Sequence, residues 1–405
     1  MHDAYKYGRN GGRTNSPPRP RIGLDLHVID GIYQGSRTHC LELFSRVVTA
    51  ALECDFVVLT ADPQKLLDFS VNFSSSNVSL VGMPPSTPAT RLLWQLPRLV
   101  KQHGIDLLHT QYIAPPFSPC ATAVTVHDVL FESHPEFFNK LFVLRSRLLV
   151  RQSVRSSAQV FTVSEFSRRQ IAETFNIEPD KIHIILNGVD CARFFPGQAG
   201  REIAEYFGLE PGRYFLTVGR LEPRKNHVNL LRAWAGLSQP RPRLVIVGQR
   251  HFGYDEALNL IHTLQLERDI VFLEDVSDEQ LPALFRNAKA FIYCSLAEGF
   301  GMPVLEAMAS GVPVISSATT ALSEICAKAA LLVQPDDIDA IRHAIGELDH
   351  AADIRHNLIR RGLSRVTDFS WEHSAAIVRD TYLRHFMPST DSSREQGLAD
   401  AEPLR

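Results

Sequence analysis

Two glutamates in the last third of the chain frame a glycine turn whose chemistry suits a nucleotide ligand. Glu298 enters the turn at residues 299–301, and Glu306 falls in the predicted first turn of a helix that runs from Pro303 to just before Gly311. The free N–H groups of a helix start, approached through glycines, favour a bound anion such as a diphosphate. Each carboxylate can accept hydrogen bonds from hydroxyls at one end of that ligand. A nucleotide sugar has hydroxyls at both ends.

Two cations are predicted near the same ligand. Arg220 follows Gly219 at the end of a predicted strand, and Lys225 precedes the next helix, so both could meet a diphosphate without a metal. Gly219 lacks the spaced glycines of a dinucleotide fingerprint, which disfavours hydride transfer. Solvated surface charge is the alternative interpretation.

The first half of the chain has its own candidates. A buried strand ends at His127 and Asp128, where the imidazole could donate to a sugar hydroxyl and the carboxylate could orient it. Gly35 and Ser36, after the first strand, could bring amides to the diphosphate or the acceptor. A structural histidine and a plain connector are the respective alternatives.

A predicted helix over residues 137–156 contains no acid. Its cations at 147, 151 and 155 share a face, with leucines at 141, 144 and 148 available for another. The face is either solvated or a surface for anionic lipid or a phosphate-linked acceptor. The cations that we predict for peripheral membrane contact are Lys140, Arg145, Arg147, Arg151 and Arg155.

Composition excludes several function classes. A net charge of −3 over 405 residues argues against nucleic acid as a partner. The six cysteines are scattered, and the acids at 336, 337 and 339 fit a helix cap, so we expect buried thiols and neither a metal nor a cofactor. Without a membrane-spanning or signal-like apolar run, we expect a cytoplasmic protein, peripheral at most at the inner face of the membrane.

Short apolar runs alternate with amphipathic stretches twice along the chain, which predicts an α/β fold with two parallel sheets. We expect strands near residues 22–27, 55–59, 78–81, 107–109, 121–126, 159–162 and 181–185, then 214–218, 243–247, 270–273, 290–293, 313–316 and 330–333. Turn signals over 187–213 mark the connection. The expected divisions are a disordered segment 1–20, domains 21–195 and 196–370, a returning helix 371–387 and a disordered tail 388–405.

Together these segments resemble the retaining family-4 glycosyltransferases of the GT-B fold, over residues 21 to about 386. The likeness extends to two further motifs, at residues 164–167 and 187–190. It implies two Rossmann-like doubly wound domains with a cleft between them, a C-terminal helix packed back on the first domain, and a transferase without a metal.

The resemblance also implies roles for particular residues. Arg220 and Lys225 would hold the diphosphate, Glu298 would contact the transferred sugar, and Glu306 would bind the ribose. His127 would face the reacting carbon. The donor-binding backbone positions that it implies are Gly35, Gly219, Gly299, Phe300 and Gly301. The loop before Gly35 departs from the family's usual Gly-Gly form.

The family implies a nucleotide sugar as donor and a glycan or lipid-linked oligosaccharide as acceptor. The stretch at 127–138 resembles bacterial mannosyltransferases of polysaccharide biosynthesis, which favours GDP-mannose over a UDP-sugar. The rival interpretation is a noncatalytic nucleotide-sugar-binding scaffold, which would not need the charged residues at 127, 220, 225, 298 and 306.

Overall fold

The chain folds around two parallel β-sheets, one in each half. The structure is a computed structural model that describes residues 19–30, 35–250 and 253–387. The first sheet has the order β3-β2-β1-β4-β5-β6-β7 and the second β10-β9-β8-β11-β12-β13, with every pairing parallel. The strands are β1 Arg21–Asp25, β2 Asp55–Thr60, β3 Val78–Gly82, β4 Leu107–Gln111, β5 Ala121–Thr125, β6 Gln159–Thr162, β7 Ile182–Ile184, β8 Tyr214–Val218, β9 Arg243–Val247, β10 Ile270–Leu273, β11 Ala290–Tyr293, β12 Val314–Ser317 and β13 Ala330–Val333.

Helices cover both faces of the first sheet, which is why its inner strands are apolar on both sides. One face packs on α1 (Gly35–Ala50) and on the last helix, α16 (Trp371–Phe386). The other packs on α4 (Leu96–His103), α6 (Lys140–Ser156) and α7 (Glu165–Phe175). Asn139 caps α6 by accepting from the amide of Leu141, so the helix begins later than the pattern predicted.

The second sheet is enclosed in the same way. One face carries α8 (Arg201–Tyr206), α11 (Leu281–Arg286), α12 (Met302–Ala309) and α13 (Thr320–Cys326). The other carries α9 (His227–Ala235), α10 (Asp255–Thr263) and α14 (Ile338–His350), while α15 (Ala352–Val366) reaches both cores. The stretch expected to be only a connection, residues 187–213, therefore contains a helix, α8.

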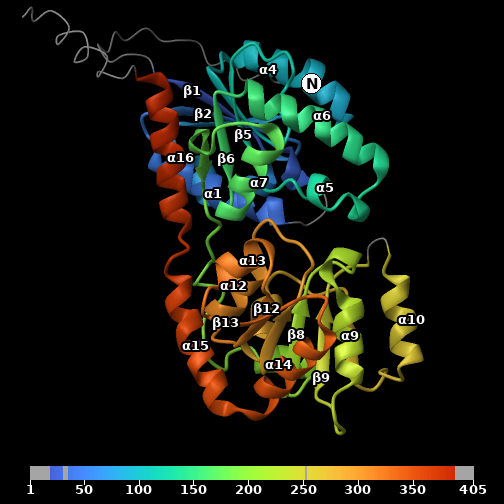
Figure 1. Ribbon diagram of the computed structural model, residues 1–405. Coiled ribbons are helices and arrows are strands. Elements are labelled where there is room, and N and C mark those ends of the chain that lie inside the picture. Colours follow the sequence, from blue (N-terminus) through green and yellow to red (C-terminus); the bar gives the residue numbers. More distant parts are fainter. Residues whose placement is uncertain (1–18, 31–34, 251–252, 388–405) are drawn as a thin grey trace, which may run out of the picture.

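The last helix returns to the first domain, as predicted, and runs beside α1 (Figure 1). Trp371 and Tyr382 are buried in the first-domain core, and the Ser374 hydroxyl donates to the carbonyl of Leu186 at 2.6 Å. Because this helix follows α15 of the second domain, it ties the two domains together.

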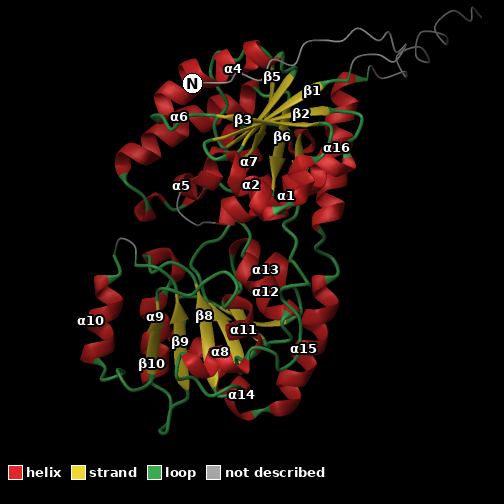
Figure 2. Ribbon diagram, turned by 180° about the vertical axis from the view of Figure 1, so that it is seen from behind, coloured by secondary structure: helices red, strands yellow, loops and turns green. Residues whose placement is uncertain are grey.

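The loops at the carboxyl ends of both sheets face each other across the middle of the molecule (Figure 2). Parallel sheets bind ligands at that edge. The segments expected to be disordered lie outside the described residues, apart from residues 19–20. No helix of the described residues combines the length and the apolarity needed to cross a bilayer. The remaining short helices are α2 Pro63–Phe69, α3 Pro88–Thr90, α5 Leu130–Ser133 and the turns η1 His27–Asp30, η2 Val71–Ser74, η3 Arg91–Gln95, η4 Pro135–Phe137, η5 Pro179–Lys181 and η6 Pro223–Lys225.

Candidate active site

The glycine turn joins β11 to α12 and depends on Gly301. This residue precedes the helix with φ at +107°, and a Cβ there would lie 2.4 Å from Cδ2 of Leu322, so no larger residue fits. Because α12 begins at Met302, Glu306 lies just beyond the first turn, where the sequence had placed it within that turn. The Phe300 side chain is buried against Phe369, so within the turn this residue is fixed by its side chain.

Glu298 is buried and accepts from three side chains. Its Oε1 lies 2.6 Å from Lys225 Nζ and 3.0 Å from the Tyr293 hydroxyl, and its Oε2 lies 2.6 Å from Nη1 of Arg224. Burial alone would raise the pKa of this carboxyl, but Arg224 and Lys225 outweigh it and lower the pKa to about 2. Glu298 is therefore an anion throughout the physiological range.

Sequence reasoning missed Arg224, which is the better-anchored cation of the pair. Its guanidinium donates to the carbonyl of Ala297 at 2.9 Å and to Glu222 Oε1 at 2.6 Å as well as to Glu298. Burial lowers the pKa of Lys225 while Glu298 raises it, the net result being a decrease. Arg224 stands next to Lys225 in the sequence, but adjacency alone does not tell that both cations contact Glu298.

Arg220 follows Gly219 at the end of β8, the sheet strand next to β11. Its Nε is buried and has no hydrogen-bond partner in the described part of the chain. An unpaired buried donor of a guanidinium is costly, and an anion is the group that would satisfy it. Gly219 packs on the Lys225 stem, with a hypothetical Cβ 3.5 Å from Cε of the lysine.

Glu306 has an unusual acidity for a carboxyl. Burial raises its pKa to about 7, opposed by the charge of Arg193 and reinforced by that of Asp278. It is therefore close to half protonated at neutral pH. If this carboxylate accepts hydrogen bonds from ligand hydroxyls, the ligand would bind best above pH 7, where Glu306 is ionised.

His127 lies two residues after the end of β5 and has a neutral ring. Its Nε2 lies 2.9 Å from Oε1 of Gln111, so Nε2 donates and Nδ1 remains an acceptor. Burial, then the nearby His39 and His109, hold the pKa of His127 well below its usual value. The prediction that Asp128 orients this ring is wrong. The Asp128 carboxylate instead accepts from the amide of Leu130 at 3.1 Å.

The two domains touch at Gly299. A Cβ on this residue would lie 2.7 Å from Cβ of Asp128 and 3.0 Å from the carbonyl oxygen of His127. The hydroxyls of Ser164 and Ser167 donate to the Gly299 carbonyl at 2.8 and 3.2 Å. The strand end that carries the first-domain histidine and the second-domain turn are thus brought together.

A carboxylate of the second domain completes this contact. Glu324 of α13 accepts from the amides of Glu165 and Phe166 at 3.0 and 2.9 Å, at the start of α7. The four-residue motif at 164–167 therefore holds the glycine turn rather than a ligand. Gly35 also faces the second domain, since a Cβ there would lie 3.1 Å from Cε of Met302. The expected loop residues 31–34 lie outside the described residues.

No group of three or more metal-ligating side chains occurs among the described residues. In the acidic segment before α14, the Asp337 carboxylate accepts from the amide of Ala340 at 2.8 Å, so it caps the helix as predicted.

The basic helix α6 differs from its prediction in the placement of its leucines as well as in its later start. Leu141, Leu144 and Leu148 were assigned to a separate face, but they are 77, 58 and 65% exposed and continue in one helical stripe to Arg151. Arg147 instead pairs with Glu132 at 2.8 Å. The core-facing residues of α6 are Val143, Ser146, Val150, Ser153 and Val154.

Comparison with solved structures defines the class of fold. Sucrose-phosphate synthase from Thermosynechococcus elongatus matches with a TM-score of 0.73 and 20% identity, covering 91% of this chain and 99% of that one. The Anabaena protein HepE in complex with UDP-glucose matches at 0.72 and 18% identity, covering 90 and 99%. The fold is GT-B, with two Rossmann-like domains.

Family models assign the two halves separately. Residues 33–193 match "Glycosyltransferase Family 4" and residues 202–365 match "Glycosyl transferases group 1". O-antigen chain mannosyltransferase B of Escherichia coli is 33% identical over 64% of this chain and 69% of its own length. O-antigen chain mannosyltransferase RfbU of Salmonella typhimurium is 31% identical over 62 and 64%. The chain belongs to the family-4, group 1 glycosyltransferases and is a glycosyltransferase enzyme.

Proposed function

We propose that this enzyme transfers a mannosyl residue from GDP-mannose, with retention of configuration, to a glycan or lipid-linked oligosaccharide in polysaccharide biosynthesis. The observation that carries the proposal is the junction at Gly299. There the His127 strand end meets a turn that holds an ionised Glu298 beside Lys225. The mannosyltransferase relatives support the sugar and the pathway.

The proposed chemistry breaks the bond between the anomeric carbon and the donor diphosphate. Arg220 and Lys225 would bind the departing diphosphate as its negative charge grows. Glu298 would accept hydrogen bonds from hydroxyls of the sugar, and Glu306 would accept them from hydroxyls of the ribose. Glu298 is a poor base because its carboxylate is held by two cations. In our proposal the proton of the acceptor hydroxyl therefore passes to the leaving diphosphate on the same face, and the new glycosidic bond forms there.

The acceptor side of the proposal has a groove to occupy. A space of about 600 Å³ in the first domain extends from Gln111 and Asp128, beside His127, to Phe138 and Phe142 at the start of α6. Aromatic and other apolar walls with a few polar groups are typical of sites for organic ligands. The groove could hold a saccharide whose reacting hydroxyl reaches the His127 strand end.

Peripheral membrane contact is also part of the proposal. The exposed stripe of α6 consists of Leu141, Leu144 and Leu148 and continues to Arg151, and no acid lies on this helix. Such a face can insert apolar side chains at a lipid surface while its cations meet anionic headgroups. The cations concerned are Lys140, Arg145, Arg147, Arg151 and Arg155.

The test is a donor panel scored for nucleoside diphosphate release. GDP-mannose, GDP-fucose, UDP-glucose and UDP-galactose are each supplied with and without crude lipid and glycan acceptors, and the product is analysed for anomeric configuration. We expect acceptor-dependent GDP release from GDP-mannose, an α-linked product, and at least a hundredfold loss in Arg220→Ala. Release from a UDP-sugar alone would overturn the donor assignment, and binding without release would favour a scaffold.

A further inference from the structure

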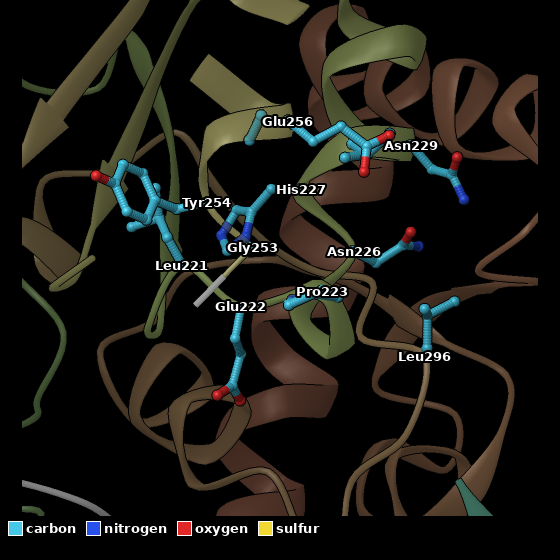
Figure 3. Close-up of a pocket in the computed structure, with 12 residues that line it drawn as sticks. Leu221, Glu222, Pro223, Asn226, His227, Asn229, Gly253, Tyr254, Glu256 and Leu296 are labelled. Atoms are coloured by element: carbon cyan, nitrogen blue, oxygen red, sulfur yellow. The ribbon is translucent and has the colours of Figure 1, made fainter. Parts of the chain in front are cut away.

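A second pocket lies in the second domain, against the segment 220–226 that carries the site cations. Its volume is about 190 Å³, and it lies between the start of α9 and the start of α10. Figure 3 shows Glu222, His227, Tyr254 and Glu256 around it. The residues to which we assigned donor and acceptor roles do not line it.

His227 is the most informative residue of the pocket. It is 5% exposed, lines the cavity, and its ring has no hydrogen-bond partner among the described residues. Buried polar side chains are rarely left without a partner, so this ring calls for a ligand or water. Burial, followed by the charge of Lys225, lowers its pKa to about 4. The ring is therefore neutral and offers one donor and one acceptor.

The start of α9 adds free donors to the same cavity. A helix begins with N–H groups that lack partners within the helix, and the Asn226 side chain does not cap this one. Its amide instead donates to the carbonyls of Cys294 and Pro335 at 2.9 and 2.6 Å. Val228 and Asn229, in the uncapped first turn, line the pocket.

The cavity lining also includes acceptors. Glu222 and Glu256 line it from different sides, and the Glu222 carboxylate, which points away from His227 in Figure 3, accepts from Arg224 at 2.6 Å. Two carboxylates disfavour an anion, although one helix start alone would attract it. The described residues include no group of three or more side chains placed to hold a metal cation, so a metal is not the expected occupant. A ligand with many hydroxyls, each both donor and acceptor, satisfies both sets.

The size and the apolar surface of the cavity limit which hydroxyl-rich ligand could bind. The cavity volume of about 190 Å³ exceeds that of a few waters, which take about 30 Å³ each. It is smaller than the ~300 Å³ at which pockets begin to bind drug-sized ligands. Tyr254, Leu221 and Leu296 provide apolar surface for the carbon face of a ring. We propose that this pocket is a second saccharide site, which binds one neutral sugar ring of a glycan away from the reaction centre.

The pocket is linked to the reaction centre through charged side chains. Glu222 binds Arg224, which in turn binds Glu298 at 2.6 Å. A sugar hydroxyl donating to Glu222 would share this carboxylate with Arg224. A glycan chain held here would therefore affect the group proposed to contact the donor sugar.

The experiment measures binding of methyl α-mannopyranoside by saturation-transfer NMR, with GDP in excess so that the donor site stays filled. The proposed function enters only through the choice of mannose, so methyl α-glucopyranoside and methyl α-galactopyranoside are run in parallel. We expect Glu256→Gln and His227→Phe each to raise the Kd at least tenfold. Asp255→Asn is the matched control, since it removes the same charge from the same turn outside the pocket lining.

A first-domain variant separates this pocket from the acceptor groove. Phe142→Ala, which alters the groove, should leave the second-domain component of binding unchanged. Glu256 is exposed, so folding of Glu256→Gln is expected even if His227→Phe fails to fold. Unchanged binding of all three glycosides in Glu256→Gln would overturn the inference. If glycoside binding depends on Glu256 as expected but the donor panel shows no mannosyl transfer from GDP-mannose, the proposed function alone would be overturned.

Discussion

Arg224 and Lys225 are neighbours with similar charge, and their contacts predict opposite consequences for Arg224→Ala and Lys225→Ala. Arg224 bridges Glu222, Glu298 and the carbonyl of Ala297. Its removal leaves two mostly buried carboxylates with one fewer cation, and breaking such a pair costs about 3 kcal/mol. At about 2–4 °C per kcal/mol, the unfolding midpoint should fall by about 6–12 °C.

Lys225→Ala removes less structure. Glu298 keeps Arg224 and the Tyr293 hydroxyl, so we expect a loss of about 1 kcal/mol, or about 2–4 °C. Turnover should respond in the reverse order. Losing the cation that we propose for the departing diphosphate should cost about 10²-fold or more, whereas Arg224→Ala, assayed well below its unfolding midpoint, should lose less turnover than Lys225→Ala.

The two readouts are differential scanning calorimetry and GDP release under saturating donor. Lys225→Met, which keeps much of the apolar stem packed on Gly219, serves as the control for lost packing. Equal destabilisation by both alanine variants, or near-wild-type turnover in Lys225→Ala, would refute the division of labour between the two cations.

Two further predictions concern the ribose end and the domain contact. With the pKa of Glu306 at about 7, its ionised fraction falls about tenfold from pH 8 to pH 6, so the KM for the donor should rise about tenfold over that range. A pH-independent KM in the wild type, or the same pH dependence in Glu306→Gln, would contradict the proposed ribose contact of Glu306. Gly299→Ala would place a Cβ 2.7 Å from Cβ of Asp128 and so disturb the contact between the domains. We expect kcat to fall at least tenfold, while the affinity for GDP measured by calorimetry stays within about threefold. A wild-type kcat would show that close contact between Gly299 and Asp128 is not needed.

The sequence sufficed for the sheets and for the edge on which the site lies, because strand and helix periodicities are local. It did not reveal the partner of His127. That partner, Gln111, ends β4, and it reaches the ring because the parallel register pairs Gln111 with Thr125 two residues before the histidine. Register of this kind depends on tertiary pairing.

Two other differences have separate causes. The helix α13, which carries Glu324, is seven residues long, too short for a periodic pattern to predict. The leucines at 141, 144 and 148 were considered available for a face apart from that of the arginines. The core instead accepts the valines and serines of α6, and the leucines remain exposed.

The geometry around Glu298 explains why one carboxylate has two cations. Taking Lys225 from a lone partner would leave a buried anion unpaired, at a cost of several kcal/mol. Because Arg224 stays on Oε2 of Glu298 and is itself fixed by Ala297 and Glu222, Lys225 can leave Oε1 without discharging the carboxylate. A donor diphosphate would then receive the lysine, and the freed Oε1 could accept a sugar hydroxyl.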